Sequence, residues 1–238
     1  MQDVDGVPVP VTTNTPVYIY SSSNTAQYSL SGSNNWQATN PLILTIMANT
    51  TSATFYYQDS TVGPAILSVK ERTDETTDDI IPIKNDSQSI NVGVGNAFKL
   101  VFSSLDSVTA GAVGGPYSVS LQDINGNVVT TQNDWPIYIS TQSGGALIAT
   151  HVDLSDAQGE LVTVIPAGAT SQTFYYTDQI ASTRWVSVSD GSPANGAIGL
   201  LDDSKSLIVN PAVVTKLKIK NAPFSVIAGS VSPQIIVE

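Results

Sequence analysis

The chain has 238 residues, of which 41% are hydrophobic, so it is long enough for one or two domains with a real core. Only 12% are charged, and 20 acidic residues against 9 basic ones give a net charge of −11, which excludes a phosphate-binding basic patch and argues against nucleic acid as a partner. Cysteine is absent, so disulfides and thiolate sites are excluded, and no apolar run is long enough to predict membrane insertion.

The first part of the chain contains blocks of sequence that return later. Three blocks recur in the same order: QDVDGVPVPVTTNTPVYIYS at 2–21 and QDINGNVVTTQNDWPIYIST at 122–141, TSATFYYQD at 51–59 and TSQTFYYTD at 170–178, and ILSVKE at 66–71 and WVSVSD at 185–190. The spacing is 120 residues for the first block and 119 for the other two. Such a constant spacing predicts a tandem repeat of one structural unit.

The second copy of the repeat contains six short segments with the pattern of β-strands. They lie at 117–123, 136–141, 160–168, 173–178, 185–190 and 206–211. Apolar and polar residues mostly alternate within them, and Gly, Asn, Asp and Pro separate them. The segment 160–168 has apolar residues on both faces, which predicts an inner strand. About seven strands in about 120 residues predict an all-β fold built as a two-sheet sandwich.

The last block of the chain resembles the opening of the repeat. Residues 215–238 match residues 98–123 through three pairs: Lys216-Leu217 with Lys99-Leu100, Ala228-Gly229 with Ala110-Gly111, and Pro233 with Pro116. We therefore expect residues 1–89 to form a sandwich without its opening strands and residues 90–209 to form a complete one. Residues 210–238 are expected to supply the opening strands of a further unit.

A sandwich without its opening strands exposes a sheet edge and part of its core. Residues 210–238 of a neighbouring molecule are one candidate to fill this position, by β-strand complementation. The return of the same chain's C-terminus is a second possibility. A first domain that is simply cut short is a third.

The order of these blocks resembles that of a known group of proteins. The elements AG, QD-x-x-G, PIYIS, IPAGATS-x-TFYYTD and VSVSD are similar to those of tandem immunoglobulin-like repeats in prokaryotic surface proteins, namely S-layer proteins, surface filaments and invasin-type adhesins. The first copy departs from the pattern, because IMAN at 46–49 stands in place of IPAG at 165–168, and this predicts a different turn.

The resemblance implies tandem immunoglobulin-like β-sandwiches, one complete and the others partial, in an extracellular or cell-surface protein. It also implies a structural, non-catalytic role and self-assembly with copies of the chain or neighbouring repeats. Two alternatives stay open: the stalk or binding module of an adhesin, and the spacer domains of a large secreted enzyme.

Two short acidic turns are candidates for calcium binding. Asp3 and Asp5 in DVDG, and Asp123 and Asn125 in DINGN, place oxygen atoms at alternate positions before a glycine. Calcium takes six to eight oxygen ligands, and such loops supply several of them. Asp-Gly and Asn-Gly also form tight turns without any metal, and a turn alone is our preferred interpretation.

Residues suited to catalysis are few. His151 is the single histidine, and Asp153 and Asp156 follow it closely, but an exposed polar residue at the end of a strand explains it as well. Two carboxylate pairs, Asp78-Asp79 and Asp202-Asp203, lie in segments that read as loops between units. No hydrolase, phosphate-loop or dinucleotide motif is present, so we expect no enzyme activity.

The tryptophans and two sequons complete the candidates. Trp36, Trp135 and Trp185 do not occupy equivalent positions in the repeat, which favours core or interface roles over a repeated sugar-binding surface. Asn49 and Asn85 stand in N-x-[ST] sequons, where a glycan can be attached if the source glycosylates its surface proteins.

Overall fold

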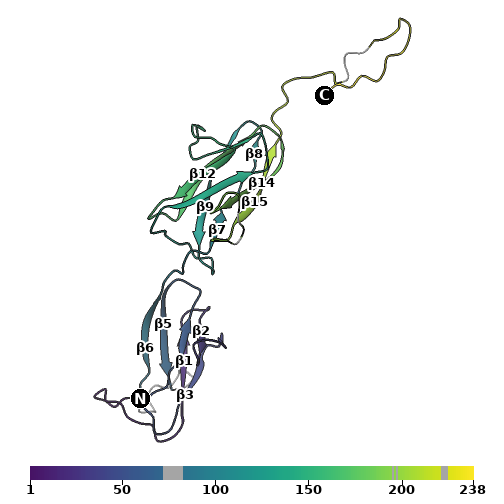
Figure 1. Cartoon of the computed structure of the whole chain (residues 1–238). Coiled ribbons are helices and arrows are strands. Elements are labelled where there is room, and N and C mark those ends of the chain that lie inside the picture. Colours follow the sequence, from purple (N-terminus) through teal and green to yellow (C-terminus); the bar gives the residue numbers. More distant parts are fainter. Residues whose placement is uncertain (72–82, 195, 197, 221–224) are drawn as a thin grey trace.

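The structure is a computed structural model of the chain, and it describes residues 1–71, 83–194, 196, 198–220 and 225–238. Figure 1 shows strands joined by loops, and no helix occurs among the described residues. The all-β prediction is therefore confirmed. In the described part of the chain there is no helix of the length and apolar character that crossing a membrane requires.

The first repeat, as we call residues 15–92, contains six strands. They are β1 (Thr15–Ser21), β2 (Gln27–Ser29), β3 (Leu42–Ile46), β4 (Tyr56–Gln58), β5 (Gly63–Lys70) and β6 (Asp86–Val92). One sheet has the order β3-β1-β5-β6, and the other consists of β2 and β4. Its core is small and is centred on Tyr28, with Val17 and Ile19 from β1 packed beside it.

The second repeat, residues 99–210, contains nine strands. They are β7 (Lys99–Phe102), β8 (Val108–Thr109), β9 (Val113–Gln122), β10 (Trp135–Thr141), β11 (Ala146–Ala149), β12 (Glu160–Ile165), β13 (Ser171–Asp178), β14 (Ser182–Ser189) and β15 (Asp203–Asn210). Two sheets, β12-β10-β14-β15-β8 and β11-β13-β9-β7, face each other. Their inward side chains form one continuous core.

The strand pairing of the first repeat reproduces that of the second. Thr15 pairs with Ile46 as Trp135 pairs with Ile165, and Tyr18 pairs with Lys70 as Tyr138 pairs with Ser189. Every strand from β1 to β6 thus has a counterpart from β10 to β15, in the same order. The sequence repeat is a repeat of structure.

The recurring YY-x-D block has a physical reason in both copies. The hydroxyl of Tyr57 donates a 2.6 Å hydrogen bond to Asp59, and that of Tyr176 donates a 3.1 Å bond to Asp178. Each tyrosine ring faces the core, and the carboxylate two residues later holds its hydroxyl at the end of the strand. The Arg184 guanidinium lies 3.2 Å from the buried Asp178 carboxylate, so that charge is paired.

Two expectations about the strands need correction. The segment 160–168 forms β12, which lies at the edge of its sheet, with Leu161 and Ile165 buried and Val162 facing solvent, so it is not an inner strand. The expected boundary between residues 89 and 90 falls inside β6, whose pairing with β5 runs to Val92.

The turn at IMAN is the same as the turn at IPAG. Asn49 and Gly168 have φ angles of 64° and 80°, and the N–H of each bonds a carbonyl, of Val11 or of Thr131, at 2.8 Å. Asparagine adopts this left-handed conformation more readily than other residues with a side chain, so it replaces the glycine here. The expectation of a different turn was wrong.

Candidate functional site

The most distinctive feature of the molecule is the open face of the first repeat. Among the described residues of 1–92, no strand occupies the positions that β7, β8 and β9 hold in the second repeat. The inward side chains beside those positions are therefore partly exposed, whereas their counterparts are buried. The pairs are Phe55 and Phe174, Tyr57 and Tyr176, Leu67 and Val186, Val69 and Val188, Ile90 and Leu207, and Val92 and Val209.

Aromatic packing shows the same difference at one position. The Phe174 ring lies 5.7 Å from that of Phe102 and 5.5 Å from that of Tyr117, measured between ring centroids. Those two partners come from β7 and β9. The ring of Phe55 has one aromatic neighbour among the described residues, Tyr28 of β2, at 6.1 Å.

β4 is shorter than its counterpart β13, because no described strand of the first repeat takes the position of β9. β13 spans Ser171–Asp178, and its first four residues pair with β9 alone. β4 spans only Tyr56–Gln58, the part that pairs with β2. Residues 52–55 have the sequence of a strand, but no strand of the described residues lies beside them to supply hydrogen bonds, so they do not join the sheet.

Asp86 is a polar group positioned at the open face. Its counterpart Asp203 accepts the N–H of Phe102 on Oδ2 at 2.8 Å, which fixes the start of the second repeat to β15. Both aspartates accept the N–H of the following serine on Oδ1, also at 2.8 Å. Asp86 and Asp203 thus share the hydrogen bond to the following serine, and the bond to Phe102 belongs to Asp203.

The described residues of the C-terminal segment, as we call residues 211–238, repeat two local features of β7–β9, a bridge and a turn. Ile219 and Val237 form an antiparallel bridge, as Phe102 and Val119 do in the second repeat. Gly229 has a φ angle of 87°, and the N–H of Ser230 bonds the carbonyl of Ile227 at 3.0 Å. The same turn lies at residues 109–112, where the φ angle of Gly111 is 81° and the hydrogen bond is 2.9 Å.

This segment is largely exposed in the single chain. The apolar side chains on one of its faces, Leu217, Ile219, Ile235 and Val237, correspond by pairing register to Leu100, Phe102, Tyr117 and Val119, which are all buried. The register also shows that Pro233 corresponds to Gly115, so its sequence match with Pro116 is wrong by one position.

The two predicted calcium turns are identical in structure. Asp3 accepts the N–H groups of Asp5 and Val7 on Oδ1 at 3.0 and 2.9 Å. Asp123 accepts those of Asn125 and Asn127 on Oδ1 at 2.9 and 2.8 Å. These hydrogen bonds account for both aspartates as turn-forming residues, which agrees with our preferred interpretation.

The predicted ligands do not gather into a metal site in the described residues. No group of three or more His, Asp or Glu side chains that could hold a metal ion occurs in that part of the chain. Asp5 and Asn125 point their side chains to solvent, while Asp123 is buried. Calcium binding stays a prediction, and the turns need no ion to explain their sequence.

Asp123 has a second role that the sequence did not reveal. Its Oδ2 accepts the N–H of Gly95 at 3.0 Å and the side-chain amide of Asn127 at 3.0 Å, so the connection between the repeats is fixed to this turn. Burial alone would raise the pKa of Asp123, but the hydrogen bonds from Asn127, Gly95 and Asn125 outweigh it and lower the pKa below its usual value.

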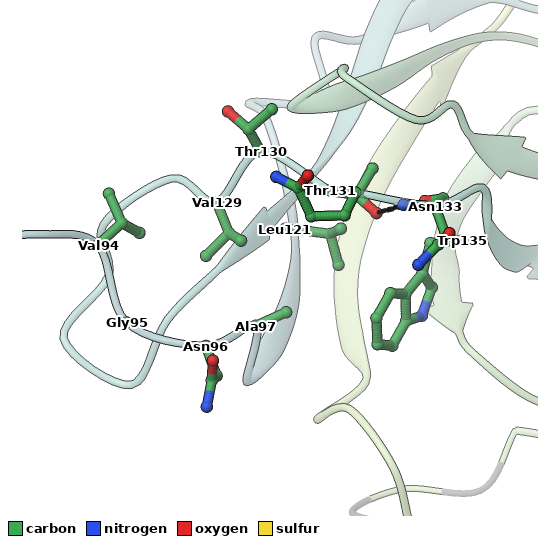
Figure 2. A pocket seen from close by; sticks show the side chains of 11 residues that line it. Val94, Gly95, Asn96, Ala97, Leu121, Val129, Thr130, Thr131, Asn133 and Trp135 are labelled. Atoms are coloured by element: carbon green, nitrogen blue, oxygen red, sulfur yellow. Dashed lines mark hydrogen bonds between the residues drawn. The ribbon is translucent and has the colours of Figure 1, made fainter.

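A cavity of about 430 Å³ lies next to this connection, and Figure 2 shows its walls. Residues 94–97 form one side, and Leu121, Val129, residues 130–133 and Trp135 form the other. Thr15 occupies the position of Trp135 in the first repeat, so the cavity has no repeated counterpart. Trp135 packs against the core, as expected, whereas Trp185 is 54% exposed on the outer face of β14.

His151 forms a surface cluster rather than a catalytic arrangement. Its Nδ1 lies 3.0 Å from the hydroxyl of Thr150 and 3.3 Å from Asp156, and its side chain is 66% exposed. A catalytic triad requires the hydroxyl and the carboxylate at opposite ring nitrogens, but here both lie at the same one. The Thr150 hydroxyl bonds Asp156 directly at 2.5 Å and lowers the pKa of that carboxyl.

The remaining candidates have structural surroundings or lie outside the described residues. Asp202 accepts the N–H of Gly196 at 2.7 Å, whereas Asp203 accepts the N–H of Phe102 in β7. The two carboxylates therefore bind different segments and do not act as a pair. Asp78 and Asp79 lie outside the described residues. The sequon residues Asn49 and Asn85 are both exposed, and glycosylation at either stays a prediction.

Comparisons with known proteins give only distant matches. No protein-family model matches the chain, and no curated protein does. Solved structures that resemble it include domains 1–6 of the surface layer protein SbsC, at 12% identity and a TM-score of 0.32 over 86% of this chain and 21% of that one. Domains 4 and 5 of the same protein match at 12% identity and a TM-score of 0.32, over 88% and 78% of the two chains.

Glycosidases are among the matches as well. A β-glucuronidase of glycoside hydrolase family 2 matches at 13% identity and a TM-score of 0.38 over 86% of this chain and 19% of that one. The chain thus spans about a fifth of the length of two of these proteins. Membership in the group of surface immunoglobulin-like repeats stays a prediction.

Proposed function

We propose that the chain is a non-catalytic structural module of a cell-surface assembly, such as an S-layer or an extracellular filament, in which copies associate end to end. One observation carries the proposal: a single sandwich pattern occurs twice in the chain with the same strand order and the same pairing register, as in a tandem array of structural units. Repeat proteins of this kind transmit load through contacts between neighbouring units.

The polar residues of the molecule support this role. Asp3, Asp59, Asp123, Asp178 and Asp203 all hold turns, strand ends or the connection between repeats. Their hydrogen-bond capacity serves the scaffold. A surface location and the absence of catalysis are parts of the proposal.

Self-association of the full chain tests the proposal. Sedimentation velocity over a concentration series, followed by negative-stain electron microscopy, should show chains of molecules that lengthen with concentration. The series is run once with calcium and once with a chelator. The comparison measures whether calcium binding at the Asp-Gly and Asn-Gly turns contributes to association. A strictly monomeric particle in both series would refute the proposal and favour a spacer role in a larger protein.

A further inference from the structure

We infer that the cavity between residues 94–97 and the loop 129–135 binds one ring of an uncharged saccharide, which packs on the indole of Trp135. The volume of about 430 Å³ lies in the range of small-ligand sites, about 300–1,000 Å³. Saccharide binding here is separate from end-to-end assembly, since a chain that stays monomeric has the same cavity.

The cavity combines an apolar floor with a polar rim. Ala97, Val129 and Trp135 pack against the core of the second repeat, and Leu121 is buried. The rim carries exposed amide and hydroxyl side chains, those of Asn96, Thr130, Gln132 and Asn133. A pyranose ring has the matching character, because its C–H face is apolar and hydroxyl groups surround its edge. Such a ring can lie on the floor while its hydroxyls reach the rim.

The cavity offers no charge to a ligand. All of its lining residues are described, and none of them has an ionisable side chain. The two nearby aspartates are engaged in the scaffold, because Asp123 accepts the N–H of Gly95 and Asp134 accepts that of Ala167 at 2.9 Å. A charged ligand would lose hydration here without gaining a counter-charge, which favours a neutral one. Side-chain amides both donate and accept hydrogen bonds, as saccharide hydroxyls do.

Hydrogen bonds hold both walls of the cavity in place. On one wall, the N–H of Gly95 bonds Oδ2 of Asp123 at 3.0 Å. On the other, the N–H of Thr131 bonds the carbonyl of Ala169 at 3.1 Å, and the Thr131 hydroxyl donates to the carbonyl of Asn133. Figure 2 shows these two walls facing each other across the cavity. Binding therefore does not have to order a loop, which lowers its entropic cost.

The sandwich itself does not require this set of side chains. In the first repeat, Thr15 stands at the position of Trp135 and Thr12 at that of Gln132, although the strand pairing is the same. One scaffold thus accepts threonine at both positions, and the second repeat has a large aromatic ring and an amide instead. Departures of this kind, which the fold does not demand, are expected at functional sites.

Saturation-transfer-difference NMR on the full chain tests the inference, because it detects the sugar protons that contact the protein whether or not the chains assemble. The probes are glucose, galactose, mannose and N-acetylglucosamine. We expect saturable binding of at least one of them with a Kd of about 1–10 mM, as for a small ligand with one apolar contact and few hydrogen bonds. Glucuronate and the uncharged peptide acetyl-trialanine amide are run in parallel and should bind about tenfold more weakly or not at all. Saturable binding of the peptide alone, or of none of the four sugars, would overturn the inference.

Two tryptophan substitutions locate the site. Trp135→Thr introduces the residue that the first repeat carries, and it should weaken sugar binding by about tenfold or more. Trp185→Thr is the matched control, because this exposed ring lies on the outer face of β14 and does not line the cavity, and it should change the affinity by no more than about twofold. A larger loss in Trp185→Thr than in Trp135→Thr would place the site elsewhere and refute the inference.

Two rim substitutions keep the test decisive if Trp135→Thr disturbs the core, which circular dichroism would reveal. Asn96→Ala and Gln132→Thr change exposed side chains that the core does not need. Each removes one hydrogen-bonding amide from the rim and should weaken sugar binding by about threefold to tenfold. Unchanged affinity in both variants would show that the sugar does not bind in this cavity.

Discussion

Truncation of two equivalent phenylalanines measures how much of the sandwich the first repeat lacks. Phe174 is fully buried between Phe102 and Tyr117, and Phe174→Ala should cost the second repeat about 3–5 kcal/mol, as for other large core rings. Phe55 is only partly buried and has one aromatic neighbour, Tyr28. Water can fill the space it leaves, so Phe55→Ala should cost the first repeat only about 1–2 kcal/mol, the transfer free energy of the buried part of the ring.

The measurement has to resolve the two repeats, because they need not unfold together. Hydrogen–deuterium exchange with peptide-level mass spectrometry gives the free energy of opening for β10–β15 and for β1–β6 separately. It is done at a concentration where the chain is monomeric. Each variant then serves as the control for the other, since the substitution should affect only its own repeat.

The difference between the two losses in stability distinguishes an open face from a closed one. Two aromatic contacts are worth about 0.5–1.5 kcal/mol each beyond buried area, and the cavity term adds to them. We therefore expect the loss at Phe174 to exceed that at Phe55 by about 2–3 kcal/mol. Losses that agree within about 1 kcal/mol would show that the face at Phe55 is closed in solution, and would refute the interpretation of the first repeat as incomplete.

Three further predictions concern the turns and the buried tyrosines. Asp123→Ala removes four hydrogen bonds that the carboxylate accepts, one from Gly95, one from Asn125 and two from Asn127. The amides of residues 93–97 should then exchange much faster, while the core strands of the second repeat stay protected. Burial, the nearby Tyr57 ring and the Asp59 charge raise the pKa of Tyr28 to about 12. A raised tyrosine pKa means that folding favours the neutral form of the side chain. The contribution to stability should therefore be complete below pH 10, the pKa in the unfolded chain, and should fall as the pH rises through about 12. Tyrosinate absorbance reports the ionisation, and circular dichroism reports the loss of structure. Asn49→Ala should destabilise the first repeat by about 1 kcal/mol, since alanine disfavours a positive φ, whereas Asn49→Gly should not, and denaturant titration distinguishes the two.

The sequence predicted the repeated strands well, because their pattern depends on local alternation and on a long-range comparison within one chain. The inward Phe174 and Tyr176 and the recurring TFYY-x-D block both follow from that comparison. Features that depend on which strands are neighbours in space were harder to predict from the sequence. Val162 and Val164 suggested a strand buried on both faces, but β12 lies at a sheet edge, and only the strand order shows this.

The sequence pattern also did not predict the geometry of the turns or the hydrogen bonds that side chains make. Asn49 adopts the backbone conformation of Gly168, although a sequence alignment treats asparagine and glycine as a mismatch. Asp203 appeared as half of a loop carboxylate pair, yet it receives the backbone N–H of Phe102 from more than 100 residues away. The recurrence of an acidic residue at 86 and 203, each at the start of a strand and followed by serine, was the signal available for finding this role.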